Sequence, residues 1–397
     1  MANFSELFHS SPIIMDGGLG TALEDVFGLH ISDTPLWSAK AIAEDPETIT
    51  AAHLAYIRAG ARVILTSTYQ CSISTFQQAG YDEKNARSLM LKAVQLTKKA
   101  REDFYSETRE NRTNENKPSY GEHVDKRVHI ALSLGPFGAT LSPTQEFDGL
   151  YPPPYGPRGY SAAEDNYNAF IRDDDENLSI EVLARFHFER LIIFANDPAT
   201  WEIIDCIAFE TVPLRREVKA IRKAMGWLKQ TLGETKAANK PWWVSCVFPG
   251  GESPEECSVG GARLTAEDMI EAAMGQNWLY EQMAVPNAIG INCTNEACLP
   301  NLIGQFEKYL DRLAFDGSKG NKPWLILYPN GGDEYDSVTR SWIEGKNKST
   351  SWGQRVWHIV TAVEEGAGEG RWGGIAVGGC CKTGPKEIAS LREAIAK

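Results

Sequence analysis

Three cysteines that follow short apolar runs have the clearest chemical potential in this sequence. Cys380 and Cys381 end the run Gly373-Gly-Ile-Ala-Val-Gly-Gly-Cys-Cys-Lys382, and Cys293 lies near the end of Ala288-Ile-Gly-Ile-Asn-Cys-Thr294. Adjacent side chains of a strand point to opposite faces, so Cys380 and Cys381 reach one ion only where the strand bends. The glycines before them permit that bend. Three thiolates without an obvious fourth ligand describe an open zinc site, the kind that performs chemistry.

Each of these cysteines also has an ordinary structural interpretation. Cysteine often serves as a small buried hydrophobic residue, and an adjacent pair such as Cys380 and Cys381 could instead be a redox couple. Cys298 could supply a fourth ligand, although it lies beyond a strand end in a segment typical of a helix's first turn. The glycine and polar residues that flank the cysteines favour the metal site.

Two acidic residues, Asp16 and Glu210, each end an apolar segment, where a carboxylate is costly unless it binds something. A substrate amino group would suit both. The alternatives are an N-cap role for Asp16 and a paired structural carboxylate at Glu210. The glycines after Asp16 lack the lysine of a P-loop and the spacing of a dinucleotide fingerprint, so we expect no nucleotide there. The histidines fall mostly away from the strand ends and do not support a histidine ligand.

Eight short apolar segments, each leading into a polar or glycine-rich turn, are the strands that must position these residues. They are Pro12–Asp16, Arg62–Thr66, His129–Leu134, Asp205–Phe209, Trp242–Phe248, Ala288–Asn292, Trp324–Tyr328 and Gly374–Val377. Near-continuous apolarity is typical of parallel strands that are buried on both faces. Helical patterns separate most of them, including 46–59, 82–100, 180–196, 214–232, 266–281 and 351–365.

Strands and helices that alternate along the whole chain predict an α/β protein with a (β/α)8 TIM barrel, and a doubly wound sheet is the alternative. We expect a single domain, residues 1–397, with loop insertions. The polar insertion 106–127 favours a solvated loop or an extended surface arm. The proline-rich insertion 142–160 follows the third strand, so it is either a rigid cover or a substrate lid.

In such a barrel, catalytic groups come from the carboxyl ends of several strands. The segments at those ends are Asp16–Gly20, Thr66–Gln70, Gly135–Gly138, Glu210–Thr211, Asn292–Thr294, Tyr328–Gly332 and Cys380–Cys381. Cys293 and the adjacent pair Cys380 and Cys381 are therefore expected at one mouth.

The composition excludes several classes of protein. No uninterrupted apolar run is long enough to span a bilayer, so we expect no membrane association. The N-terminus lacks the basic and apolar regions of a secretion signal, and eight cysteines in so long a chain do not form a dense disulfide framework, which favours the cytoplasm. A formal net charge of −13 without a Lys/Arg cluster argues against nucleic acid.

Through these residues the sequence resembles the homocysteine S-methyltransferase family of zinc-dependent barrels, over almost its full length. The matching motifs are Met15-Asp-Gly-Gly-Leu-Gly-Thr21, Pro35-Leu-Trp-Ser-Ala39, Thr66-Ser-Thr-Tyr-Gln70, Ser133-Leu-Gly-Pro136, Phe209-Glu-Thr211, Gly290-Ile-Asn-Cys-Thr294, Tyr328-Pro-Asn330 and Gly378-Gly-Cys-Cys381. The resemblance implies that Cys293, Cys380 and Cys381 bind Zn²⁺ and act in catalysis. It also implies that Asp16 and Glu210 hold the amino group of homocysteine and that the product is methionine. The other substrate-binding residues it implies are Gly17, Thr68, Asn292 and Tyr328.

Within the family the sequence is similar to the branch that uses S-methylmethionine or S-adenosylmethionine, through Tyr-Gln after Thr-Ser-Thr and a basic residue after Gly-Gly-Cys-Cys. It departs from the family at Lys382, where arginine is more usual, at Gly331, where serine is common, and in the long insertions. These departures concern donor preference and the shape of the lid. Aromatic faces can hold a sulfonium cation. The candidates are Tyr151, Tyr155, Tyr160 and Tyr328.

The chemistry of the residues fits this activity. A thiol with a pKa near about 8.5 is mostly protonated at neutral pH, whereas zinc deprotonates a bound thiol and leaves the nucleophilic thiolate. Two other classes stay open: a metal-sensing or redox-active thiol barrel that uses the pair Cys380 and Cys381, and a metal-independent lyase or aldolase, for which no lysine stands at a strand end before Lys382. Small molecules are the expected partners, and a monomer is the favoured oligomeric state.

Overall fold

The computed structural model describes residues 3–31, 36, 39–114, 127–233, 239–275, 283–315, 322–332, 334–336, 341–343, 350–366 and 370–397. Eight parallel strands form one sheet, and all eight predicted strands are confirmed. They are β1 (Ile13–Ile14), β2 (Val63–Leu65), β3 (His129–Leu134), β4 (Cys206–Val212), β5 (Trp242–Cys246), β6 (Ala288–Asn292), β7 (Trp324–Tyr328) and β10 (Ile375–Val377). The order across the sheet is β1-β10-β7-β6-β5-β4-β3-β2.

Hydrogen bonds between the first two strands close this sheet into a barrel. Met15 bridges Val63 in parallel, Asp16 N donates to Val63 O at 3.0 Å, and Arg62 N donates to Ile14 O at 2.7 Å. The two edges of an eight-stranded sheet thus meet, which an open doubly wound sheet does not allow. The predicted (β/α)8 barrel is confirmed, and the doubly wound alternative is wrong.

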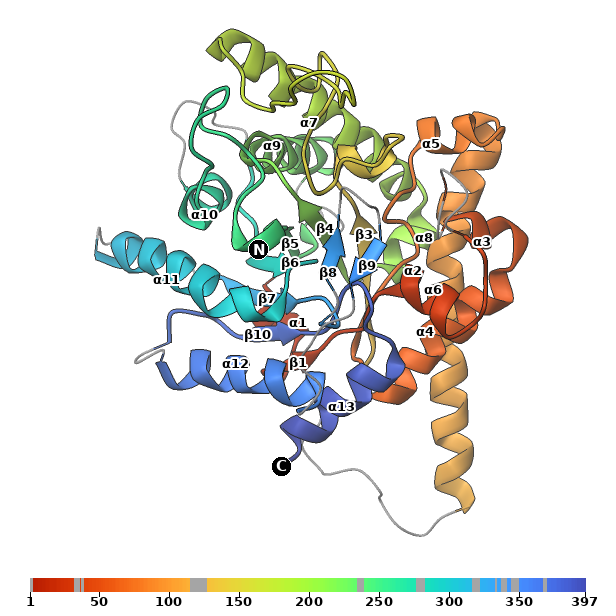
Figure 1. Ribbon diagram of the computed structural model, residues 1–397. Coiled ribbons are helices and arrows are strands. Elements are labelled where there is room, and N and C mark those ends of the chain that lie inside the picture. Colours follow the sequence, from red (N-terminus) through yellow and green to blue (C-terminus); the bar gives the residue numbers. More distant parts are fainter. Residues whose placement is uncertain are drawn as a thin grey trace.

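Helices surround the strands on the outside of the barrel, as Figure 1 shows. They are α1 (Phe4–Leu7), α2 (Leu19–Asp25), α3 (Lys40–Glu44), α4 (Pro46–Ala59), α5 (Ile73–Gln78), α6 (Glu83–Asn114), α7 (Asp173–Ala195), α8 (Pro198–Ile203), α9 (Arg215–Leu232), α10 (Ala266–Met274), α11 (Leu299–Phe315), α12 (Trp352–Gly366) and α13 (Pro385–Ile395). The described 3₁₀ turns include η2 (Phe137–Thr140), η4 (Pro249–Gly251) and η5 (Glu296–Cys298). A two-stranded antiparallel hairpin joins β8 (Glu334–Asp336) to β9 (Ser341–Ile343).

Helix α4 shows why the sequence begins and ends a helix where it does. The Asp45 side chain accepts a hydrogen bond from Thr48 N at 3.2 Å, and Pro46 occupies the first turn, where no backbone donor is needed. Gly60 ends the helix with a φ of 126°, which a side chain would disfavour. The predicted bounds 46–59 are confirmed.

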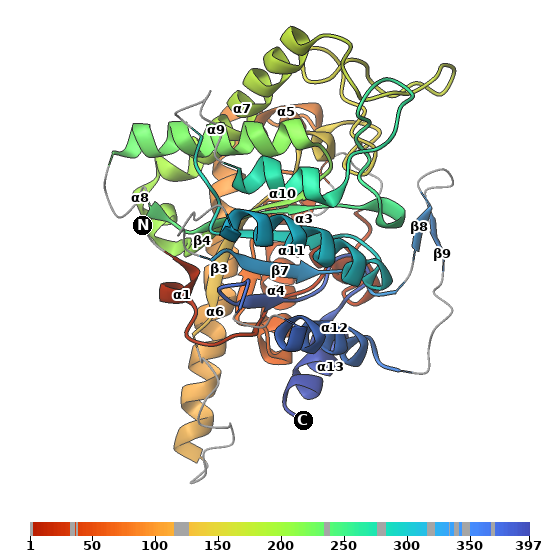
Figure 2. The same ribbon diagram turned by 90° about the vertical axis from the view of Figure 1, so that its left-hand side faces the viewer.

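Three helices differ from the prediction: α7 begins at Asp173 rather than at 180, and the other two are α6 and α10. Helix α6 continues through Asn114, so the first part of the insertion 106–127 is helical rather than a loop; 115–126 lie outside the described residues. Helix-forming residues and i,i+4 ion pairs such as Lys99–Asp103 support that extension, and Figure 2 shows α6 projecting beyond the barrel. Helix α10 ends at Met274 before Gly275, and the end of the predicted helix 266–281 lies outside the described residues.

Aromatic side chains of α1 close the amino-end of the barrel. The Phe4 and Phe8 rings stack at 5.2 Å, and Phe4 also packs against Trp243 and Trp324 at 5.9 and 6.2 Å. Figure 2 shows α1 at the end of the barrel opposite the β8–β9 hairpin. The carboxyl ends of the strands therefore form the end at which a site can open. No helix in the described ranges has the length and apolarity needed to cross a membrane.

Candidate active site

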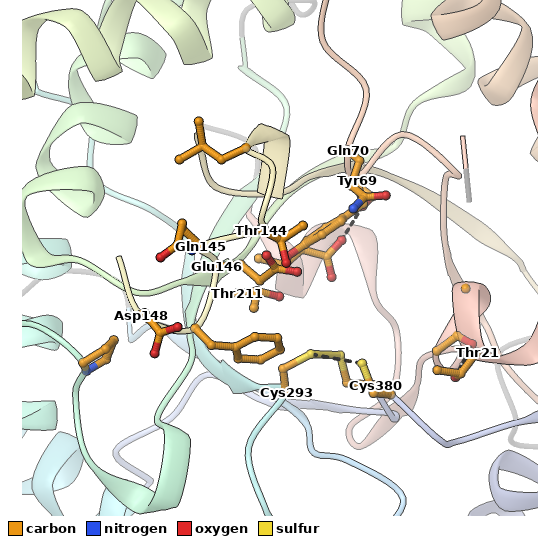
Figure 3. Close-up of a pocket in the computed structure, with 18 of the residues that line it drawn as sticks. Thr21, Tyr69, Gln70, Thr144, Gln145, Glu146, Asp148, Thr211, Cys293 and Cys380 are labelled. Carbon is orange, nitrogen blue, oxygen red and sulfur yellow. Dashed lines mark hydrogen bonds between the residues drawn. A yellow bond between two sulfur atoms is a disulfide. The ribbon is translucent and has the colours of Figure 1, made fainter. Parts of the chain in front are cut away.

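A cavity of about 1260 Å³ lies where the carboxyl ends of the strands meet (Figure 3). One wall, here called the strand side, consists of residues at or just beyond strand ends: Asp16, Thr66, Ser133, Glu210, Cys293, Tyr328, Cys380 and Cys381. The other wall, here called the loop side, consists of Leu141–Asp148, Leu150 and Asn166–Asn168. The insertion 142–160 was predicted to be a cover or a lid, and its first half is a wall of the cavity.

The three predicted cysteines meet on the strand side, where their sulfur atoms all lie within 4.8 Å of one another. Cys293 and Cys380 are joined as a disulfide, and Cys293 Sγ lies 3.8 Å from the free Cys381 Sγ. The bonded pair is therefore not the adjacent pair proposed as a redox couple. Cys298 lies outside the cluster. It packs beside Gly251, since a Cβ added to Gly251 would lie 3.0 Å from the Cys298 sulfur. The prediction of Cys298 as a possible fourth ligand is wrong.

Backbone torsions that non-glycine residues rarely adopt are concentrated at this cluster. In the described part of the chain, the non-glycine residues with positive φ are Thr211 (59°), Cys293 (48°) and Lys382 (59°). Such torsions cost about 1–3 kcal/mol each and tend to cluster at functional sites. For Thr211 the strain is greatest, because its side chain is β-branched.

The buried amide of Asn292 holds Thr211 in this conformation. Its Oδ1 accepts from Thr211 N at 2.8 Å, and its Nδ2 donates to Thr211 Oγ1 at 2.7 Å and lies 3.8 Å from Cys380 Sγ. Asn292 does not line the cavity, and neither does Thr68, which is buried and donates to Ser133 O at 2.7 Å. The polar atoms of both residues support the strand ends, and their contact with the substrate stays a prediction.

Glycines allow the loops after β1 and β10 to pack backbone against backbone. A Cβ at Gly17 would lie 2.3 Å from Thr383 O, and one at Gly18 would lie 2.3 Å from Cys380 O. Gly18 N donates to Thr383 O at 3.0 Å, which fixes the contact. Gly17 lines the cavity as predicted for a substrate contact, and the same residue is needed for this close approach.

Two residues noted as departures from the family pattern, Gly331 and Lys382, contact each other. A Cβ at Gly331 would lie 2.0 Å from Lys382 O, and Gly331 N donates to Cys381 O at 2.9 Å. The Lys382 side chain reaches Asp25 at 2.7 Å. The two departures are thus one local packing arrangement next to the cysteine cluster.

Asp16 and Glu210 face the cavity as buried carboxylates. Asp16 Oδ2 accepts from Leu65 N at 2.9 Å, and Glu210 Oε1 accepts from Ser133 Oγ. Burial raises the pKa of Asp16 well above its usual value, and the charge of Glu210 raises it further. Burial likewise raises the pKa of Glu210 to about 7, although hydrogen bonds from Ser133 and Tyr328 act in the opposite direction.

The contacts match neither of the structural roles considered for these acids, an N-cap at Asp16 and a paired carboxylate at Glu210. The N-cap of α2 is Gly18 and lacks a side-chain hydrogen bond, so Asp16 does not cap that helix. Among the described residues, no salt bridge joins either Asp16 or Glu210 to a cation. Two buried carboxylates with raised pKa values, which form no salt bridge within the described residues, are suited to bind a cation from a ligand.

The four tyrosines suggested for cation binding separate into two groups. Tyr328 and Tyr160 line the cavity, and Tyr160 is 46% exposed. Tyr151 is buried and donates to Glu217 Oε2 at 2.6 Å, and Tyr155 stacks on Phe137 at 3.9 Å. Tyr151 and Tyr155 are thus part of the support behind the loop side, and their contact with a cation stays a prediction.

Two cavity residues, Tyr69 and Glu146, were not among the predicted site residues. Tyr69 is half-buried at the cavity beside the end of β2, and it belongs to the motif Thr66–Gln70 that predicts a strand end, so this motif could have identified it. Glu146 comes from the loop side (Figure 3), and burial raises its pKa to about 7. No strand-end pattern indicates Glu146, because the fold of a long loop decides where it lies.

A parallel barrel with a thiol cluster and buried carboxylates at its carboxyl-end mouth defines an enzyme with a small-molecule site. The homocysteine S-methyltransferase family model matches residues 13–395, and the chain therefore belongs to that family, as its motifs predicted.

Individual relatives agree with this assignment. The chain is 32% identical to the homocysteine S-methyltransferase YbgG of Bacillus subtilis, over 96% of this chain and 93% of the relative. It is 29% identical to homocysteine S-methyltransferase 3 of Zea mays, over 96% of this chain and 90% of the relative. Its fold is similar to that of the metallated form of the homocysteine methyltransferase MmuM from Escherichia coli, with a TM-score of 0.59, 24% identity and 98% coverage of both chains.

Proposed function

We propose that this enzyme transfers a methyl group from a sulfonium donor, S-methylmethionine or S-adenosylmethionine, to the sulfur of zinc-bound homocysteine and so forms methionine. Membership of the family supports methyl transfer to homocysteine. The observation that carries the proposal is the meeting of three cysteine sulfurs with two buried carboxylates in one cavity. The first group suits a metal-held thiolate, and the second suits the amino group of the same substrate.

The donor set fits zinc. Thiolate ligands lie about 2.3 Å from zinc, so two of them in a tetrahedron are about 3.8 Å apart; the sulfurs of Cys293 and Cys381 are 3.8 Å apart. Cys293, Cys380 and Cys381 would hold the ion once the Cys293–Cys380 disulfide is reduced. Zinc would keep a bound homocysteine thiol ionised at neutral pH. Asn292 Nδ2, 3.8 Å from Cys380 Sγ, orients that ligand.

Asp16 and Glu210 would bind the homocysteine ammonium. Both are buried, and both have a raised pKa because of that burial. A bound ammonium would supply the missing positive charge and return both groups to the ionised form. The substrate would then be fixed at its amino group as well as at its sulfur, which limits the directions from which a methyl group can approach.

The charge of the cavity lining favours a cationic donor. The acidic lining residues are Asp16, Glu24, Glu146, Asp148, Glu210 and Glu256, and the basic ones are Arg263 and Lys382. An excess of acids attracts a cation. A sulfonium loses its positive charge on transfer, so the spent donor loses this attraction and can leave. The cavity volume of about 1260 Å³ accommodates either sulfonium and does not choose between them.

The proposal extends to the compartment and the oligomeric state. A site that needs three reduced thiols suits the cytoplasm, where thiols are kept reduced. We also propose that the enzyme acts as a monomer, since every group named above comes from one chain. Light scattering across a concentration series would contradict this if a stable dimer formed.

The decisive experiment combines metal analysis with a panel of methyl donors. We expect about one zinc per reduced chain and methionine formation from homocysteine with S-methylmethionine, S-adenosylmethionine or both. Betaine and a methyl-folate serve as the competing donors. Full activity in a preparation without metal would refute the zinc proposal, and turnover with betaine but neither sulfonium would refute the donor proposal.

A further inference from the structure

The loop side carries one carboxylate, Glu146, in a fixed position. Gln145 N donates to Gly138 O at 2.9 Å, and Gly149 N donates to Gln145 O at 2.9 Å, so the backbone on both sides of Glu146 is hydrogen-bonded. Behind it, Tyr151 donates to Glu217. A side chain on a loop held in this way points to a defined part of the cavity.

One oxygen of this carboxylate has no hydrogen-bond partner among the described residues. Glu146 Oε2 is buried and lacks a hydrogen bond within the described part of the chain, while Thr144 hydrogen-bonds the same side chain. A buried carboxylate oxygen without a partner is costly, and such atoms in native proteins call for a ligand or water. Figure 3 shows Glu146 among the cavity-lining side chains that lie above Cys293 and Cys380.

The titratable groups described as acting on Glu146, or on which it acts, are Asp148, Tyr69 and Cys381, and they come from three different segments. Asp148 of the same loop raises the pKa of Glu146, after burial. Glu146 in turn raises the pKa of Tyr69, beyond β2, and of Cys381, beyond β10. Glu146 is thus close enough to the cysteine cluster to act on it electrostatically. The two basic residues of the lining engage other groups: Arg263 Nη1 donates to Pro254 O at 2.6 Å and acts on Asp148, and Lys382 Nζ donates to Asp25 Oδ2 at 2.7 Å.

We propose that the Glu146 carboxylate binds the positively charged sulfur region of the methyl donor, opposite the thiol cluster. This assignment rests on the proposed function and specifies which residue recognises the donor. It differs from the roles of Asp16 and Glu210, which lie on the strand side and face the amino group of homocysteine. Burial raises the pKa of Glu146 to about 7, and an arriving cation would favour its ionised form.

The charge change during transfer determines which kinetic constant Glu146 controls. The bond between the homocysteine sulfur and the methyl carbon forms, the bond between that carbon and the donor sulfur breaks, and its electron pair stays on the donor sulfur, which becomes neutral. No proton, oxidant or reductant is involved. The donor is most positive before transfer, so a carboxylate beside it stabilises the bound donor at least as much as the transition state. Its loss should therefore raise KM for the donor rather than lower kcat.

The test is Glu146→Gln in the reduced, zinc-loaded enzyme. We expect the donor KM to rise by about tenfold or more, with kcat, homocysteine KM and zinc content within about twofold of the wild type. The matched control is Glu256→Gln, because Glu256 also lines the cavity but its Oε2 already accepts from Gly260 N at 3.2 Å. This control removes one acid of the lining whose oxygen already has a partner, so it should raise the donor KM far less than Glu146→Gln. Glu146→Asp, which keeps the charge on a shorter side chain, should fall between Gln and the wild type.

A neutral methylating probe, methyl 4-nitrobenzenesulfonate, separates charge recognition from a change in shape. Glu146→Gln should react with this probe as fast as the wild type. An unchanged sulfonium KM, an equal rise in the Glu256→Gln control, or an equal loss of reaction with the neutral probe would each overturn the inference. If the wild type itself turns over neither sulfonium, the proposed function has failed; if it does and only these variant results disagree, only the role of Glu146 has failed.

Discussion

The strand side and the loop side of the cavity are held in place by different means. On the strand side, position follows from the register of the sheet: Cys293 N donates to Tyr328 O at 3.3 Å, directly beyond the pairing of Asn292 with Tyr328. The turn at Cys380 is fixed in the same way, since Cys380 N donates to Pro329 O at 2.8 Å. Groups of this kind move only if the barrel itself moves.

The loop side depends instead on a few buried polar contacts. Asn168 Nδ2 donates to Asp148 O at 2.9 Å and to Pro254 O at 2.8 Å, and Arg216 Nη1 donates to Asn168 O at 2.8 Å and to Glu255 Oε1 at 3.0 Å. These contacts join two parts of the loop side to each other and tie Asn168 to Pro254 and to Arg216 of α9. The difference suggests a division of labour, in which the rigid strand ends hold the reacting sulfur and the separately anchored loop selects the donor.

The largest effect is expected from removing a cysteine on the strand side. Cys380→Ser removes one of three soft ligands, and we expect loss of bound zinc and a fall in methyl transfer of at least about a hundredfold. The barrel should remain folded, because a core of this size does not depend on one ion. Metal analysis, turnover and thermal melting measure the three outcomes.

The exposed cysteine Cys257 provides the matched control for that variant. Cys257→Ser makes the same chemical change outside the cluster and should leave zinc content and turnover as in the wild type. Normal zinc binding in Cys380→Ser would remove the main reason for assigning the reacting sulfur to the strand side.

A smaller effect is expected from the two carboxylates of the strand side. Asp16→Asn or Glu210→Gln should weaken homocysteine binding by roughly 2 kcal/mol, or about thirtyfold, with zinc and donor KM unchanged. In the wild type, homocysteine affinity should fall as pH drops below about 7, the pKa to which burial raises Glu210, because the protonated acid no longer attracts an ammonium.

Glu210→Gln also tests the pKa of Glu210 in the ligand-free enzyme. Its pKa in the fold, about 7, is above its ordinary value of 4.5, so the folded state holds the proton more tightly and stability is lost as pH rises through this interval. Glu210→Gln should therefore melt higher than the wild type above pH 7, and the difference should vanish below pH 4.5. A constant difference at every pH would assign the effect to packing.

The next smaller effect is expected from substitution of Asn292, which supports the strand side without lining the cavity. Asn292→Ala leaves Thr211 N without its acceptor and removes the amide beside Cys380 Sγ. We expect roughly tenfold weaker zinc binding, with homocysteine KM nearly unchanged once zinc is saturating. Competition with a chelator measures the first quantity. A large rise in homocysteine KM at saturating zinc would instead indicate that Asn292 contacts the substrate.

How far the sequence predicts this molecule differs between the same two sides. Apolar runs that end in Asp16, Glu210 or Cys293 predict both a strand and the direction of its end, so the strand side follows from one-dimensional patterns. The sequence did not indicate that Thr68 and Asn292 hydrogen-bond neighbouring strand ends, because strand-end segments contain both cavity-facing and inward-facing polar residues. The face to which each side chain points depends on the backbone torsions at the turn, and Thr211, with its positive φ, is an example.

For the loop side, the sequence predicted only that an insertion lies near the mouth of the barrel. Its prolines and tyrosines indicated a stiff segment near the mouth, but the burial of Tyr151 and the exposure of Glu146 to the cavity depend on long-range contacts with α7 and α9. A pattern in the sequence does not encode such contacts. Helix α6 was underestimated for a different reason, because charged residues such as those of 106–114 suit both loops and exposed helices.

The smallest effect, and the most direct test of separate anchoring, is expected at Tyr151. Its hydroxyl donates to Glu217 Oε2 at 2.6 Å, while Glu217 Oε1 accepts from Phe137 N at 2.7 Å and from His187 Nε2 at 2.9 Å. Tyr151→Phe keeps the ring against Phe137 but leaves a buried carboxylate oxygen without its donor, which costs about 1–3 kcal/mol of stability. Melting should occur at a lower temperature, and the donor KM should rise about two- to threefold as the loop side loosens. Homocysteine KM and zinc content depend on the strand side and should not change; if they shift together with the donor KM, the two walls of the cavity are mechanically one unit and the division of labour between them is wrong.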